Sequence, residues 1–272
     1  MGFNREILWR PSKRRSKDSA LAKYMSWLKE HYSLNFSTYQ DLWEWSTNDL
    51  EQFWETIWLY FDLKSSQSYS KIQGQKKMPG AEWFIDCELN YVEQLLRAKD
   101  ITPHKSAIVS YSETHGKKTL TWSELSQQVS SLADHFKKMG VKKGDRIVAV
   151  LPNTPAALIA FLATASLGAI WSICAPDMGH VAILDRFKQI EPKILIAQDG
   201  YIYADKKIDR REVLKTIIDG LSSLQKKIIL PVVGSLPEDA LSWDSLLTQE
   251  VDFTPVQVPF DHPLWIVYSS GT

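Results

Sequence analysis

Hydrophobic and polar positions follow two alternating patterns from about residue 106 onward. Short apolar runs rich in Val and Ile are typical of buried strands, and they alternate with longer segments whose apolar residues recur at helical spacing. Strands alternating with helices of ten or more residues predict βαβ units, and so an α/β fold with parallel sheets flanked by helices. The predicted strands are 106–111, 119–122, 145–151, 169–174, 193–197, 227–233 and 264–268. The predicted helices are 123–139 (with Ser123 as cap and Gly140 as stop), 155–167, 180–190, 210–224 and a short one near 241–247.

The first 78 residues have a mainly helical pattern. Apolar spacing predicts helices at 18–30, 38–45 and 48–61, the last one capped by Thr47 or Asn48. The polar segment 65–78 is predicted to be a linker or exposed loop, and 89–99 an amphipathic helix. We therefore expect a helical, Trp-rich N-terminal cap and linker at 1–78, followed by a larger α/β domain at 79–272.

Residues 156–175 carry no charge, and a run of this length could cross a bilayer. Gly168 interrupts the run, and the Ala-Ile-Trp-Ser-Ile-Cys that follows is typical of a strand. A buried helix, a glycine stop and a buried strand fit the surrounding pattern better than a membrane span.

Composition disfavours nucleic-acid binding, membrane binding and a resident metal. The 32 basic residues balance 32 acidic ones, so no global field favours nucleic acid or an anionic membrane. The basic run 13–17 is read as a solvated segment entering a helix, and the N-terminal tryptophans as packing residues, in preference to a base-stacking surface. Cys87 and Cys174 form no CxxC pair, and the six histidines show no metal spacing. A reduced, cytoplasmic protein without a resident metal is expected.

The last residues carry the most specific chemistry. The apolar run Leu264–Tyr268 predicts a buried strand, which breaks into Ser269, Ser270, Gly271 and Thr272. Small hydroxyl residues and glycine after a strand form a loop whose backbone N–H groups can approach a phosphate closely. An ordinary turn would have the same composition.

Several further segments resemble the acyl-CoA synthetases of the adenylate-forming superfamily. The similarity extends over the whole chain. Within the superfamily the chain most resembles the ligases for short acids, and among these the ligases for acetoacetate. The matching segments are Leu8-Trp9-Arg10-Pro11-Ser12, Met78-Pro79-Gly80-Ala81, Leu151-Pro152-Asn153, Ala163-Thr164-Ala165-Ser166-Leu167-Gly168-Ala169-Ile170-Trp171-Ser172, Leu184-Asp185-Arg186-Phe187, Glu191-Pro192-Lys193 and Phe260-Asp261-His262-Pro263-Leu264-Trp265.

The resemblance implies a two-step ligase with ATP, Mg²⁺ and CoA as reactants. The carboxylate of the acid attacks the α-phosphate of ATP to give an acyl-adenylate and pyrophosphate, and the CoA thiol then displaces AMP. Ser269, Ser270, Gly271 and Thr272 match the first half of the loop that holds the β- and γ-phosphates in that family. The family's catalytic residues lie beyond Thr272, so the chain is expected to be the N-terminal part of an enzyme, inactive by itself. Acetate or propionate as the acid, or a non-catalytic remnant, are the alternatives.

The resemblance also gives Lys206 a role as a contact to a CoA phosphate, although the family's arginine is missing nearby and Asp205 would repel an anion. A solvated lysine on a turn is an equal alternative. Arg186 is expected to pair with Asp185 or Glu191, His262 to serve in a turn, and Cys174 to be an inert buried residue.

Overall fold

The computed structural model describes residues 8–114, 116–234, 237–248 and 250–269. The chain forms two compact units, one of residues 1–64 with 69–86 and the other of residues 65–68 with 87–272. Residue 78, after which we predicted a domain division, lies between two paired strands of the first unit. That division stays a prediction.

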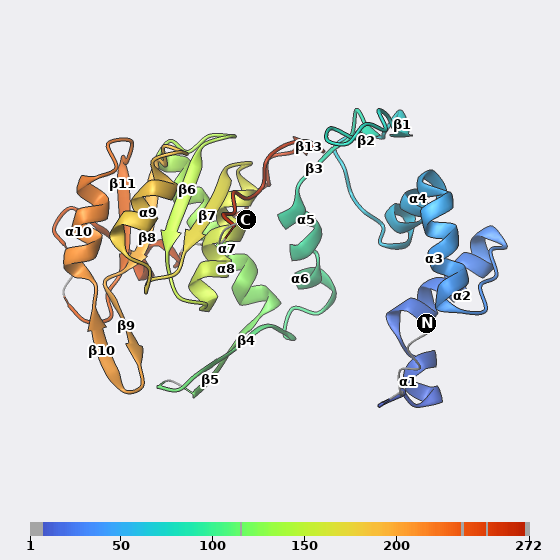
Figure 1. Cartoon of the computed structure of the whole chain (residues 1–272), viewed down its shortest axis with the longest axis horizontal. Helices are drawn as coiled ribbons and strands as arrows, with labels where there is room; N and C mark the ends of the chain where they lie inside the picture. The colour runs from blue at the N-terminus through green and yellow to red at the C-terminus, as the bar shows by residue number, and fades with distance from the viewer. Residues whose placement is uncertain (1–7, 115, 235–236, 249, 270–272) are drawn as a thin grey trace, which may run out of the picture. The chain divides into compact units, whose positions relative to one another are not determined.

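The first unit contains four helices within its described residues: α1 Lys13–Lys17, α2 Ala20–Tyr32, α3 Tyr39–Asn48 and α4 Leu50–Tyr60 (Figure 1). Its core is built on Tyr24, Leu28 and Leu42, and the hydroxyl groups of Tyr24 and Thr56 lie 2.7 Å apart inside it. Burial raises the pKa of Tyr24, so its hydroxyl stays protonated and shares a hydrogen bond with Thr56.

Three predictions for this region were wrong in detail. The cap of α4 is Asp49, which accepts from the backbone N–H of Gln52, because Thr47 and Asn48 still belong to α3. The basic run 13–17 is exposed along its length, as predicted for a solvated segment, but it forms the short helix α1 itself and does not lead into one. The polar segment 65–78 contains strand β1 Lys71–Gln73, which pairs antiparallel with β2 Trp83–Ile85.

The second unit begins with short elements. Strand β3 Glu88–Leu89 pairs antiparallel with β13 Val258–Pro259, and the helix predicted at 89–99 is two helices, α5 Tyr91–Leu96 and α6 Ala98–Ile101. Asn90 begins α5 by accepting from the N–H of Val92, and its amide also donates to the carbonyl of Val256. Strands β4 Ser106–Ser112 and β5 Gly116–Thr121 form an antiparallel hairpin.

A five-stranded parallel sheet forms the centre of this unit, in the order β12-β11-β8-β6-β7. Figure 1 labels four of these strands, β11, β8, β6 and β7. The parallel sheet was predicted correctly. Its strands are β6 Arg146–Val150, β7 Ile170–Cys174, β8 Ile194–Gln198, β11 Lys226–Leu230 and β12 Leu241–Ser242. The segment predicted as a short helix at 241–247 is β12 followed by a 3₁₀ turn, Asp244–Leu246.

Helices cover both faces of the sheet, as predicted. Helices α7 Trp122–Lys138 and α8 Pro155–Ser166 pack with Ile147 and Ala149 on one face. Helices α9 His180–Phe187 and α10 Arg211–Asp219 pack with Val148 and Val150 on the other. This alternation follows from the period of two in a strand, which sends successive side chains to opposite faces.

The cap of α7 is Thr121 and not Ser123. Thr121 accepts from the N–H of Glu124, whose carboxylate accepts from the N–H of Thr121 in return. This reciprocal pair satisfies two N–H groups at the helix start, and it lowers the pKa of Glu124. Gly140 ends α7 in the left-handed region with φ +83°, as predicted.

Candidate active site at the carboxyl edge of the sheet

The carboxyl ends of the parallel strands form one edge of the sheet, where ligands bind in open α/β sheets. The segment predicted as a strand at 264–268 runs parallel to β7 and reaches this edge. The N–H of Trp171 donates to Leu264 O at 3.1 Å, and the N–H of Ile266 donates to Trp171 O at 2.8 Å. The pairing is limited to one bridge, between Trp171 and Trp265, so the predicted strand is shorter than expected. The prediction that it is buried was also wrong, because Leu264, Trp265 and Val267 are exposed in the described part of the chain.

Side chains extend this attachment. The Ser172 hydroxyl donates to Ile266 O at 2.9 Å, and the rings of Trp265 and Phe161 lie 4.9 Å apart between centroids. The Nε2 atom of His262 is 2.7 Å from Gly168 O, and the N–H of His262 donates to Pro259 O in a turn. The turn role predicted for His262 is therefore confirmed.

Tyr268 contacts α9. Its hydroxyl donates to the main-chain oxygen of Arg186 at 2.7 Å, and the Arg186 guanidinium carbon lies 5.6 Å from the centre of the Tyr268 ring. The guanidinium also donates to Ala182 O at 2.8 Å. The expected pairing of Arg186 with Asp185 or Glu191 was wrong, because the guanidinium contacts the carbonyl of Ala182 and the ring of Tyr268. The carboxylate of Glu191 lies 4.0 Å from the guanidinium of Arg146 instead.

Ser269 is exposed directly after this segment. The other residues of the predicted phosphate loop, Ser270, Gly271 and Thr272, lie outside the described residues, so the phosphate role of the four stays a prediction. The segment leading to them does end at the edge of the sheet where a phosphate would be expected.

The second predicted contact, Lys206, lies on a hairpin that we did not predict. Strand β9 Gly200–Tyr203 pairs antiparallel with β10 Lys206–Asp209, and the turn between them places Ala204 and Asp205 at φ +47° and +60°. A two-residue turn with both φ values positive matches the twist of a hairpin, although glycine and asparagine are its usual residues. Lys206 is exposed and lies opposite Tyr203 in register.

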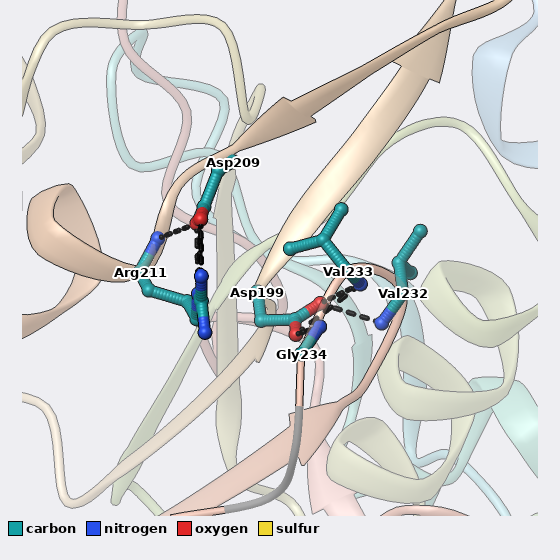
Figure 2. A network of polar contacts seen from close by, with 6 residues as sticks. All are labelled: Asp199, Asp209, Arg211, Val232, Val233 and Gly234. Atoms are coloured by element: carbon teal, nitrogen blue, oxygen red, sulfur yellow. Dashed lines mark hydrogen bonds and ion pairs between the residues drawn. The ribbon is translucent and has the colours of Figure 1, made fainter.

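Asp199 connects this hairpin to the end of β11 (Figure 2). The residue is 3% exposed, and its carboxylate accepts from the N–H groups of Val232, Val233 and Gly234 at 2.5, 3.1 and 2.8 Å. The next residue, Gly200, has no room for a side chain, since a Cβ there would lie 2.5 Å from Ile208 O. Asp199 was missed in the sequence, although an acid directly after a buried strand is a usable signal.

The structure also bears on three further possibilities: a reactive cysteine, a metal site and a membrane span. Cys174 is 4% exposed in β7, and burial raises the pKa of its thiol, which fits the predicted inert role. Within the residues that the structure describes, no three His, Cys, Asp or Glu side chains gather as a metal site. No helix in the described part of the chain is long and apolar enough to cross a membrane, and residues 156–175 form α8 and β7 instead.

Comparison with known proteins agrees with this architecture. A family model described as "AMP-binding enzyme" matches residues 96–272, and one described as "Acetyl-coenzyme A synthetase N-terminus" matches residues 39–95. The first match covers more than half of the chain, which therefore belongs to the AMP-binding enzyme family.

The individual relatives are similar to the chain over nearly its whole length. Acetoacetyl-CoA synthetases from Gallus gallus and Danio rerio are both 35% identical over 98% of this chain. The solved structure of acetoacetyl-CoA synthetase from Streptomyces lividans is 39% identical over 98% of this chain, with a TM-score of 0.94. The chain spans only 42% of the length of each of these proteins.

Proposed function

We propose that this chain takes part in the ATP-dependent ligation of a short acid to CoA, with acetoacetate as the acid. The observation that carries the proposal is the end-to-end similarity to acetoacetyl-CoA synthetases, at 35% identity over 98% of the chain. The attachment of the segment 264–268 to β7 supports it, because this attachment leads toward the loop that would hold the phosphates.

The proposed chemistry has two steps. The acid's carboxylate oxygen attacks the α-phosphorus of ATP, and the bond to the pyrophosphate oxygen breaks. The thiolate of CoA then attacks the acyl carbon, and AMP leaves with its phosphate oxygen. Both steps depend on fixed positions and on neutralised phosphate charge, which backbone N–H and hydroxyl groups of a small-residue loop can provide.

Ser269, Ser270, Gly271 and Thr272 would hold the β- and γ-phosphates, and Mg²⁺ would come with ATP as part of the substrate. Lys206 would meet a phosphate of CoA. A cytoplasmic location and a place in ketone-body metabolism belong to the same proposal.

The first experiment is ATP–pyrophosphate exchange on the protein that carries this chain, with acetoacetate, acetate or propionate as the acid. Exchange that depends on acetoacetate above the other two is the expected result. A preference for acetate or propionate would reassign the acid, and no exchange with any acid would overturn the ligase proposal. The same measurement on the 272 residues alone tests the expectation that they are inactive by themselves.

Lys206 has a matched control in its neighbour. Lys206 and Lys207 are both exposed, but their side chains leave opposite faces of the hairpin. Lys206→Ala is expected to raise the KM for CoA about tenfold, the loss of one charged hydrogen bond of about 1.4 kcal/mol, and to leave the KM for ATP unchanged. Lys207→Ala should change neither; equal effects of the two would contradict a specific contact.

A further inference from the structure

Tyr268 directly precedes Ser269, and its side chain contacts helix α9. Its hydroxyl donates to the main-chain oxygen of Arg186, in the last turn of α9, at 2.7 Å. The same carbonyl accepts from the N–H of Gln189 at 3.2 Å, and its second lone pair is free to accept from the tyrosine hydroxyl. The guanidinium of the same Arg186 lies over the Tyr268 ring, 5.6 Å from its centre. Arg186 of α9 thus contacts both the hydroxyl group and the ring of Tyr268.

The residues on either side of Tyr268 are exposed to solvent. The backbone pairing to β7 reaches Ile266, whose carbonyl also accepts from the Ser172 hydroxyl. Val267 is 75% exposed and Ser269 is exposed. The segment is therefore fixed to β7 up to Ile266 and to α9 at Tyr268.

The tyrosine is suited to act as a donor. Burial raises the pKa of Tyr268 above its ordinary value, so the hydroxyl keeps its proton at neutral pH. The hydrogen bond to Arg186 O is then present over the whole physiological range.

We propose that Tyr268 is a positioning residue for phosphate binding: bound to Arg186, it fixes where the chain leaves the sheet and so where Ser269, the first residue of the proposed phosphate loop, is presented to a polyphosphate. This inference rests on the phosphate role proposed above for that loop. One residue spans at most about 3.6 Å, so an anchor at Tyr268 strongly limits the position of Ser269. A loop held in place loses less conformational freedom when a ligand binds, and it therefore binds more tightly.

The test uses the whole chain and the variant Tyr268→Phe, which keeps the ring over the guanidinium and removes the hydroxyl. Two quantities are measured: the affinity for inorganic tripolyphosphate by calorimetry, and backbone hydrogen exchange across residues 264–269. The matched control is Tyr111→Phe, since Tyr111 lies on the β4 hairpin and is 75% exposed.

Tyr268→Phe should weaken tripolyphosphate binding roughly fivefold and speed exchange at 264–269 by a similar factor, as expected for the loss of one hydrogen bond. Exchange in the rest of the sheet and the melting temperature should stay as in the unaltered chain. That combination separates positioning from general destabilisation, which would speed exchange throughout the unit. Tyr111→Phe should leave both measured quantities unchanged.

The remaining outcomes are decisive as well. Equal tripolyphosphate affinity for Tyr268→Phe and the unaltered chain would overturn the proposal. If the unaltered chain binds no tripolyphosphate, the phosphate role of the loop fails by itself, and hydrogen exchange still tests the anchor: unchanged exchange at 264–269 in Tyr268→Phe would show that Tyr268 anchors nothing.

Discussion

Asp199 is a buried carboxylate stabilised by the main chain. Three backbone N–H groups, from Val232, Val233 and Gly234, point at its two oxygens (Figure 2). Burying a charge is costly unless hydrogen bonds replace the lost water, and these three donors replace it directly. The same bonds fix the chain after β11 beside the start of the β9 hairpin, so one side chain connects two segments more than 30 residues apart.

Replacing Asp199 should therefore destabilise the second unit. Asp199→Ala leaves three N–H groups without an acceptor and is expected to lower the free energy of unfolding by about 3 kcal/mol. Asp199→Asn retains one oxygen and should lose about half as much. Urea unfolding measures both, with Asp209→Asn as the control, because Asp209 forms an exposed ion pair with Arg211 that should matter little. A small loss for Asp199→Ala would show that water replaces the carboxylate.

The pair Asp145 and Lys193 gives the stability of the fold a dependence on pH. Burial alone would raise the pKa of Asp145, but hydrogen bonds from Lys193 and from the N–H of Lys142, together with the nearby positive charges, lower it below 3.8. A carboxyl whose pKa is lower in the folded state than in the unfolded state stabilises the fold above the unfolded pKa. This stabilisation is lost as pH falls through the folded pKa.

Unfolding in urea at pH 7 and at pH 3 should show this loss, and Asp145→Asn should lose less stability than the unaltered chain over the same interval. The exposed pair Lys215 and Asp219 supplies the control, since Asp219→Asn should leave the pH dependence close to that of the unaltered chain. An unchanged acid response in Asp145→Asn would contradict the assignment.

At the scale of elements, α7 and α8 end in the same way but in different surroundings. Gly140 and Gly168 each follow their helix in the left-handed region, with φ +83° and +64°. A Cβ on Gly140 would meet no atom within 4 Å, whereas a Cβ on Gly168 would lie 3.0 Å from Cγ1 of Val258. Gly168 is therefore needed both for its backbone conformation and for the close approach of β13.

The two glycines make a matched pair for measurement. Gly140→Ala should cost about 1 kcal/mol, the strain of an alanine in the left-handed region. Gly168→Ala should cost about 2 to 3 kcal/mol, because the new methyl group also displaces Val258. Thermal unfolding of the two variants compares them directly. Equal losses would mean that β13 moves away freely.

The elements that could be predicted are those whose pattern depends on burial alone. Strands β6, β7 and β8 and the helices between them are long apolar or amphipathic runs, and they were found within a few residues of their ends. The β9 hairpin could not be found, because its turn uses Ala204 and Asp205 in place of glycine or asparagine. Strand β1 was missed because its buried residue is Gln73, a polar side chain in a polar segment.

The position of the candidate site along the chain could be predicted from the sequence, but the side-chain contacts that hold it could not. A small-residue loop after a strand could be read from Leu264 to Thr272, since both the apolar run and its end are local features. The contacts of Tyr268 with Arg186 and of Ser172 with Ile266 join residues 82 and 94 positions apart. Such contacts depend on the order of strands in the sheet, which no local pattern contains.

At the scale of the whole molecule, the two units are not two consecutive stretches of chain. Residues 65–68 belong to the second unit and 69–86 return to the first, so the backbone passes between the units after residues 64, 68 and 86. The family models divide the chain elsewhere, between residues 95 and 96, inside α5. Similarity in sequence and compactness in space therefore give different boundaries, and a deletion designed on the family models would cut through α5.

The attachment of the segment 262–268 to β7 has a consequence for the order of folding. Its side-chain contacts, His262 with Gly168 and Ser172 with Ile266, each close a loop of 94 residues. The β6, β7 and β8 pairings join residues much closer in sequence, and closing a longer loop costs more chain entropy. We expect this edge to be added after β6, β7 and β8 have paired and to open before they separate. The edge that leads to the proposed phosphate loop would then form only after the central strands have paired.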